Sequence, residues 1–245
     1  MRRRRPSLLV AFSGMDGSGK STQIGLLREH LKSQGRQTEV VWTRLEWTTL
    51  WESSGVLERI AAPVKWVLGG TRPVSPRGRA PIGAAGFSAS GPATSRAARL
   101  RRRNALLTHA WVLTVAVVHA RHQRAAVRSA SAPGTIVLCD RYTLDAAVGL
   151  RRRYGDQRSF GLQVKLMELL SPRPALAWHV DVPPAVARSR KEEGFSEQEL
   201  DRIGELYAEE RARFGWRRLD GRLPPAGLGG EVARAVDATL RQRRA

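Results

Sequence analysis

Gly14-Met15-Asp16-Gly17-Ser18-Gly19-Lys20-Ser21-Thr22 is a complete phosphate-binding loop of the Gly-x-x-x-x-Gly-Lys-Ser type. It follows an apolar run, Leu8 to Ser13, that predicts a buried strand, and it precedes a run typical of a helix, Gln23 to Leu31. A strand that leads into a glycine-rich turn points backbone N–H groups at anionic oxygens, and the following helix adds the positive end of its dipole. The sequence therefore predicts a binding site for a nucleoside triphosphate at this loop.

The side chains of the loop take distinct parts in such a site. Lys20 would reach the β- and γ-phosphates, and the Ser21 hydroxyl would ligate Mg²⁺. ATP and Mg²⁺ are therefore the expected cofactors. The residues expected to bind the nucleotide are Gly14, Asp16, Gly17, Ser18, Gly19, Lys20, Ser21 and Thr22.

Length and composition indicate one large domain over residues 1–245, because apolar segments are spread evenly along a chain long enough for a sizeable core. The single cysteine, Cys139, excludes a disulfide framework and a thiolate metal cluster. Arg2 to Arg5 lead into the first strand without the apolar core of a signal peptide, and the longest apolar helical run, 105–118, is shorter than a membrane span. We expect a soluble cytoplasmic protein that does not bind membranes.

The net charge of +20 comes mostly from arginine, since lysine occurs only at positions 20, 32, 65, 165 and 191. Alanine and glycine are also abundant, which is the bias that GC-rich codons produce. A basic surface is compatible with nucleic-acid binding. We expect most of this charge to be solvated and compositional, and nucleic acid not to be the main partner.

Strands and helices are expected to alternate along the chain. The further strands are predicted at Gln37–Thr43, Thr135–Cys139, Ala175–Val182 and Trp216–Leu219, and the further helices at about Trp47–Leu68, Asn104–Arg128, Phe160–Leu170, Glu197–Phe214 and Leu228–Arg243. This alternation predicts an α/β fold with a parallel sheet covered on both faces. With the phosphate loop after the first strand, we expect a P-loop NTPase-type three-layer sandwich with a five-stranded parallel sheet. Ligands of such sheets bind at the carboxyl ends of the strands.

Residues 69–103 interrupt this alternation. The segment is rich in Gly, Pro, Ala, Ser and Arg and has no acidic residue. A loop of this length inside a compact domain is either functional or disordered. We expect a mostly disordered basic insertion, and the alternative is a mobile flap that closes on an acceptor or an anionic partner.

Several segments carry patterns that are specific in combination. They are the loop from Phe12 to Gln23 with its Asp16, Val41-Trp42-Thr43-Arg44, the Asp140-Arg141-Tyr142 triplet after an apolar strand, His179 to Pro184 followed by Ala187-Arg188, and Trp216 to Gly221. Together they resemble the thymidylate kinase family of nucleoside monophosphate kinases, from Leu8 to about Val236 outside the insertion.

The resemblance implies a role for each matched position. Ser21 and Asp140 would hold Mg²⁺, while Arg44 and Arg141 would clamp the anionic group of the acceptor. Asp16, Tyr142 and Asp145 would complete the acceptor site. A lid at 188–199 would bring its basic residues to the transferring phosphoryl group. The expected catalytic residues are Lys20, Arg141, Arg188, Arg190 and Asp16. The alternative is a solvated helix face for the lid arginines and an ion pair for Arg141.

The acceptor half departs from the family pattern. Leu45-Glu46 follows Arg44 in place of Glu-Pro, Asp145 stands where the family has a serine, and Leu150 stands where it has a glutamine that helps read thymine. A leucine cannot hydrogen-bond a base edge. The resemblance therefore implies phosphotransferase chemistry more firmly than it implies thymidylate as the acceptor.

We therefore expect an ATP-dependent phosphotransferase of nucleotide biosynthesis that moves the γ-phosphoryl of ATP to dTMP or a related nucleoside monophosphate. We expect either weak discrimination among pyrimidine monophosphates or a preference for an acceptor with more exposed hydroxyls or a basic nitrogen. The alternatives are a kinase of another small molecule, a nucleic-acid 5′-end kinase, and a non-catalytic nucleotide switch. The tryptophans at 42, 47, 51, 66 and 111 are expected in the core or on the face of a homodimer, although one could stack on an acceptor ring. His119 and His122 are expected to be partly exposed.

Overall fold

The structure, a computed structural model, describes residues 8–43, 105–154, 160–191 and 195–243. Arg44, the predicted helix at 47–68 and the insertion at 69–103 lie outside the described residues. The chain divides into two compact units, Met1–Leu45 with Ala116–Ala245, and Glu46–Val115. All the strands described below belong to the first unit. In the second, the described residues are 105–115, the first turns of helix α5 (Ala105–Ala130).

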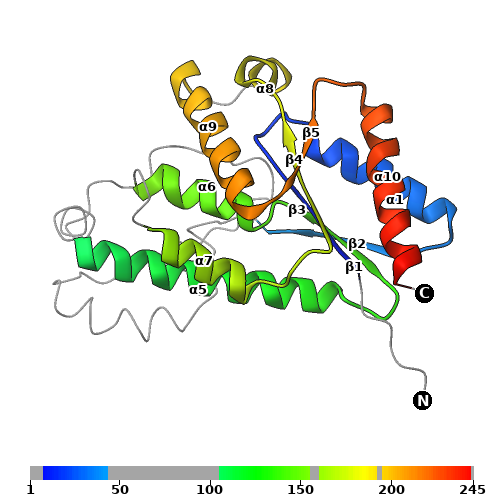
Figure 1. Ribbon diagram of the computed structural model, residues 1–245, viewed down its shortest axis with the longest axis horizontal. Coiled ribbons are helices and arrows are strands. Elements are labelled where there is room, and N and C mark those ends of the chain that lie inside the picture. The colour runs from blue at the N-terminus through cyan, green and yellow to red at the C-terminus, as the bar shows by residue number, and fades with distance from the viewer. Residues whose placement is uncertain (1–7, 44–104, 155–159, 192–194, 244–245) are drawn as a thin grey trace, which may run out of the picture. The chain divides into compact units, whose positions relative to one another are not determined.

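The first unit is built on a five-stranded, all-parallel sheet with the strand order β2-β3-β1-β4-β5 (Figure 1). Its strands are β1 (Leu8–Ser13), β2 (Thr38–Trp42), β3 (Ile136–Asp140), β4 (Leu176–Asp181) and β5 (Arg217–Asp220). Each lies within one residue of its predicted bounds or inside them. All six residues of the central β1 are buried, because a strand in the middle of a parallel sheet is covered on both faces. The predicted α/β fold class is confirmed.

Two hydrophobic clusters cover the two faces of the sheet. One face packs Val10, Phe12 and Trp178 against α1 (Lys20–Ser33) and α10 (Pro225–Gln242), which lie side by side. The opposite face packs against α6 (Thr143–Tyr154) and α9 (Glu197–Phe214), which contact each other. The two clusters are the cores of a three-layer arrangement.

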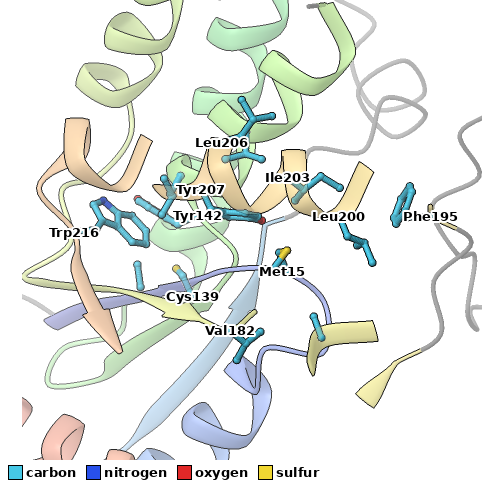
Figure 2. Packing of buried hydrophobic residues seen from close by; sticks show 14 of the residues in the cluster. Met15, Cys139, Tyr142, Val182, Phe195, Leu200, Ile203, Leu206, Tyr207 and Trp216 are labelled. Carbon is cyan, nitrogen blue, oxygen red and sulfur yellow. The ribbon is translucent and has the colours of Figure 1, made fainter. Parts of the chain in front are cut away.

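Figure 2 shows the second cluster, in which Met15 of the phosphate loop lies among residues of other elements. Tyr142, at the start of α6, and Tyr207, on α9, both lie in this cluster near Cys139 of β3. Burial raises the pKa of the Cys139 thiol to about 12, as expected for a small core residue. The loop is therefore packed directly onto this core.

Five of the helices in the described residues were predicted: α1, α5, α7 (Gly161–Leu170), α9 and α10. The α9 helix has its predicted bounds because a capping box of Ser196 and Glu199 starts it and Gly215, in the left-handed conformation, ends it. The α10 helix begins three residues before its prediction because Pro225 fits the first helical position.

Of the other two helices, α6 was not predicted, and the second was implied only by the resemblance, as a helix that enters the lid. Residues 143–154 form α6 directly after β3, without a loop that would mark its start, and Pro184–Arg190 form the short α8. The prediction for His119 was also wrong: its side chain is buried, while His122 on the same helix is exposed. Within the described residues, no helix combines the length and the apolar character that a membrane crossing needs.

Candidate functional site

The phosphate loop joins β1 to α1 at the carboxyl end of the sheet. Gly14 and Gly17 have φ angles of 146° and 78°, in the region that residues other than glycine rarely adopt. A Cβ atom at Gly14 would lie 2.4 Å from the carbonyl oxygen of Val180, and one at Gly17 would lie 2.4 Å from that of Ala187. Both glycines are required because the loop passes against the backbone of β4 and α8.

Lys20 stabilises this loop from within. Its side chain is buried, and its Nζ donates hydrogen bonds of 2.7 Å to the carbonyl oxygens of Gly14 and Met15. The ammonium therefore lies inside the curve of the loop, where a cation attracts phosphate oxygens most strongly.

The loop forms one wall of a cavity of about 580 Å³. The cavity is lined by Asp16, Gly17, Ser18, Gly19, Lys20, Ser21, Thr22, Gln23, Trp42, Asp140, Arg141, Val180, Arg190, Lys191, Gly221, Leu223, Pro225 and Leu228. All of the predicted nucleotide-binding residues line it except Gly14, the first residue of the loop, which is buried. A volume of this size suits a small-molecule ligand of nucleotide dimensions.

Asp140 and Ser21 meet where the predicted Mg²⁺ site lies. The Ser21 hydroxyl donates a hydrogen bond of 3.1 Å to Oδ2 of Asp140, and Oδ1 of Asp140 is buried without a hydrogen-bond partner in the described part of the chain. Burial raises the pKa of Asp140, while the charge of Lys20 and the bond from Ser21 lower it. A buried carboxylate oxygen with spare acceptor capacity beside a hydroxyl fits a hard cation that keeps phosphate and water ligands.

The described residues offer no larger metal cluster beside this predicted site. Over the described ranges, no group of three or more His, Cys, Asp or Glu side chains could hold a metal ion. Ser21 and Asp140 would therefore hold Mg²⁺ only together with the phosphates of a nucleotide.

Arg141 projects from the end of β3 with a strained backbone. Its φ of 69° lies in the left-handed region, which costs a residue with a Cβ about 1–2 kcal/mol. Its N–H donates to the carbonyl oxygen of Phe12, and its own carbonyl oxygen accepts a 2.5 Å hydrogen bond from Thr43. Backbone held this firmly in a strained conformation is typical of functional positions.

The guanidinium of Arg141 pairs directly with Asp16 in the lining of the cavity, and Asp16 also lies 3.5 Å from Nζ of Lys191. The structure therefore brings Asp16, Arg141 and Lys191 together beside the phosphate loop. The interpretation of Arg141 as an ion-pair partner and its interpretation as an anion clamp are compatible, because an incoming anion can replace Asp16.

The predicted lid residues are placed unequally. Arg190 lines the cavity and donates a 3.1 Å hydrogen bond to the carbonyl oxygen of Gly221, whereas Arg188 is exposed and does not line it. Residues 192–194 of the predicted lid lie outside the described residues. Arg190 is the better placed of the two predicted catalytic lid arginines.

Three residues predicted on the acceptor side do not line the cavity. The Tyr142 ring is fully buried and its hydroxyl donates to the carbonyl oxygen of Pro172. Leu150 is also fully buried, and the Asp145 side chain is only 8% exposed. The placements do not fit direct contact of these side chains with an acceptor.

Sequence reasoning did not assign Tyr207 or the wall formed by Leu223, Pro225 and Leu228. Tyr207, on α9, donates a 2.8 Å hydrogen bond to Asp145. The amphipathic pattern of α9 predicts only that Tyr207 is a core residue, and it gives no sign of this contact. The wall residues follow the last strand. Because ligands of parallel sheets bind at the carboxyl ends of the strands, this position could have identified them as candidates.

No family model matches the chain. Among curated proteins, a probable thymidylate kinase of Pyrobaculum aerophilum is 25% identical over 238 residues, which cover 95% of this chain and 97% of that protein. A thymidylate kinase of Symbiobacterium thermophilum is 29% identical over 197 residues, which cover 80% of this chain and 71% of that protein. The relatives' names support a nucleotide kinase function. Together with the parallel sheet and its phosphate loop, these matches support the assignment of the chain to a thymidylate kinase-like family.

Proposed function

We propose that the protein transfers the γ-phosphoryl group of ATP to a nucleoside monophosphate, with dTMP or another pyrimidine nucleotide as the acceptor. The observation that supports this most directly is the meeting of three features at one cavity: the phosphate loop, the Ser21–Asp140 pair and the Arg141 guanidinium. A nucleotide switch would need only the first two of these. An arginine held in strained backbone opposite the loop is suited to clamping a second anion.

The donor phosphates would bind in the loop. Its backbone N–H groups and the positive end of α1 favour anionic oxygens, and Lys20 would exchange its bonds to Gly14 and Met15 for bonds to phosphate. Magnesium, held by Ser21 and Asp140, would neutralise charge on the β- and γ-phosphates. The apolar side chains of Leu223 and Leu228 would face the nucleoside of ATP.

The acceptor phosphate would bind at Arg141. By replacing Asp16 as the partner of the guanidinium, it would leave the Asp16 carboxylate free to accept a hydrogen bond from a sugar hydroxyl. Arg190 and Lys191, at the cavity rim, would then neutralise the charge that spreads over the transferring phosphoryl oxygens. Phosphoryl transfer requires this in-line placement of two anions more than it requires covalent chemistry.

The described residues say less about which base the acceptor carries than about where its phosphate would bind. The expected weak discrimination among pyrimidines rested on Leu150 and Asp145, and neither offers an atom to a base in this structure. Trp42 lines the cavity and is 53% exposed, so its indole is available for stacking, which every base tolerates. Weak discrimination among pyrimidines therefore stays a prediction. Its support is now the exposed indole of Trp42, and no longer the leucine at the position where the family has a glutamine.

An ADP-release assay against a panel of acceptors tests the proposal. The panel contains dTMP, UMP, CMP, AMP, a sugar phosphate and a DNA 5′-hydroxyl end, each at matched Mg²⁺. We expect release with the pyrimidine monophosphates and none with the sugar phosphate or the DNA end. Preference for either of the last two would replace the proposed acceptor class.

A further inference from the structure

One carboxylate, that of Asp145, binds three separate parts of the site. Its Oδ1 accepts hydrogen bonds from the Gly14 N–H at 3.3 Å and from the Tyr207 hydroxyl at 2.8 Å. Its Oδ2 accepts one of 2.9 Å from the Tyr142 N–H, and its Oδ1 lies 3.6 Å from Nη1 of Arg141. Four groups from the phosphate loop, the segment after β3 and the α9 helix therefore share one side chain.

These groups hold two features that phosphoryl transfer needs, the phosphate loop and the Arg141 guanidinium. The carbonyl oxygen of Gly14 accepts a hydrogen bond from Lys20 and lies 3.2 Å from the Tyr207 hydroxyl, whose single proton is donated to Asp145. The placement of Gly14 therefore sets the curve of the loop around the ammonium. Tyr142 follows Arg141, whose left-handed backbone persists only if its surroundings hold it. The bond from the Tyr142 N–H to Asp145 is half of a capping box that starts α6 directly after Arg141.

The surroundings of Asp145 supply few other charges. His119 and His179 both interact with it electrostatically, and burial lowers the pKa of each to about 4, so both rings are neutral near pH 7. The ring of His179 stacks on that of Tyr207 at a centroid distance of 5.2 Å. The Asp140 carboxylate also interacts with Asp145, and its like charge is unfavourable. The Asp145 carboxylate therefore depends on Arg141 and on its three hydrogen-bond donors, as a buried charge must.

We propose that Asp145 is a positioning residue that holds the first residue of the phosphate loop and Arg141 in one arrangement, so that donor and acceptor anions meet in line. The inference rests on the proposed function. It replaces the expectation that Asp145 contacts the acceptor, because its oxygens are occupied by protein donors.

Asp145→Asn and Tyr207→Phe test the proposal with little change of shape. Asp145→Asn removes the charge and should lower kcat by about 10- to 100-fold, because a displacement of about 1 Å in such a site has effects of this size. It should also raise the Kd for Mg²⁺–ATP by about 3- to 10-fold, since the loop amides are displaced too. Tyr207→Phe should give a smaller decrease in kcat, and the double variant should lose no more than about 3-fold beyond Asp145→Asn, because both break the same contact.

A matched control is available on the same two helices. Arg151 of α6 pairs with Glu210 of α9 at 2.9 Å, and both side chains are buried and lie outside the cavity lining. Glu210→Gln should lower the melting temperature at least as much as Asp145→Asn, while kcat and the Kd for Mg²⁺–ATP stay within about 2-fold of wild type.

The outcomes separate the two proposals. If Asp145→Asn, or Tyr207→Phe where the first variant does not fold, behaves like Glu210→Gln and lowers only the melting temperature, then the positioning role is wrong. If the wild-type protein phosphorylates none of the acceptors, the proposed function fails, and the inference is decided by calorimetric Kd values for Mg²⁺–ATP. Weakened binding in Asp145→Asn and not in Glu210→Gln would then support it, and equal binding in both would overturn it.

Discussion

At the scale of single residues, the site depends on charges held in place by the backbone around them. Lys20 bonds to two carbonyl oxygens of its own loop, and Arg141 is fixed at both its N–H and its carbonyl group. Neither side chain belongs to a hydrophobic cluster, so each can be changed without removing core packing.

Lys20→Ala should lower kcat by at least about 10²-fold, because it removes a cation aimed at charge that develops in the transition state. Lys32→Ala is the matched control, since Lys32 is exposed near the other end of α1. The measurement is steady-state ADP release at saturating ATP and acceptor. Turnover of Lys20→Ala equal to that of Lys32→Ala would contradict the role given to the loop.

Arg141→Ala and Arg141→Gly should both lose phosphoryl transfer, because each removes the guanidinium. Their stabilities should differ, since glycine adopts a φ of 69° without the strain that alanine incurs. We expect Arg141→Gly to be more stable than Arg141→Ala by about 1 kcal/mol in denaturant unfolding. Equal stability would show that the backbone relaxes when the arginine is removed.

At the scale of elements, β1, β3 and β4 were predictable because each is a short, mostly apolar run, whereas β5, Arg217–Asp220, has a single apolar residue and was predicted from its place in the alternation and in the resemblance. The α9 helix was predictable to the residue because Ser196, Glu199 and Gly215 are local signals of its ends. The α6 helix was not, because it starts directly after a strand and its capping residue, Asp145, is also the side chain that binds Gly14 and Tyr207.

Ser196→Ala should lower the free energy of unfolding by about 1 kcal/mol, because it removes the hydrogen-bond acceptor that caps α9 at the Glu199 N–H. The kcat below the melting transition should not change, since Ser196 does not line the cavity. Ser189→Ala, on the exposed side of α8, serves as the control. A decrease in kcat without a change in unfolding would instead place Ser196 in the catalytic machinery.

At the scale of the whole molecule, long-range contacts decided what the sequence could not predict. The Tyr207 hydroxyl lies 3.2 Å from the Gly14 carbonyl oxygen although the two residues are 193 positions apart in the chain. No local sequence pattern predicts such a contact. The part proposed to bind phosphate and Mg²⁺ could be predicted because one loop and Asp140, the last residue of β3, compose it, whereas the wall of Leu223, Pro225 and Leu228 was not predicted. The acceptor half was predicted from a family pattern, and the structure buries Tyr142, Asp145 and Leu150.

The pH dependence of stability should reflect the two buried histidines. His119 and His179 have pKa values of about 4 in the folded protein because burial disfavours their charged forms. Their ordinary value is near 6.5, so the unfolded chain binds more protons between these two values. The free energy of unfolding should therefore fall as the pH falls from about 6.5 to about 4, by a few kcal/mol per histidine.

Urea unfolding at several pH values measures this slope. His119→Gln should flatten it, because it removes one of the two buried histidines that bind fewer protons in the folded protein. An equally steep slope in His119→Gln would mean that the pKa of His119 is the same in the folded and the unfolded protein, which would contradict the effect of burial.

The central claim is that one cavity brings ATP and a nucleoside monophosphate together for direct transfer. Its most direct test follows the γ-phosphoryl group of isotopically labelled ATP in the presence of dTMP, with wild type and Lys20→Ala side by side. The account predicts that the label appears in the nucleoside diphosphate with wild type, in amounts equal to the ADP formed, and that Lys20→Ala transfers almost none. Label that appears only in inorganic phosphate, whatever nucleoside monophosphate is supplied, would contradict it.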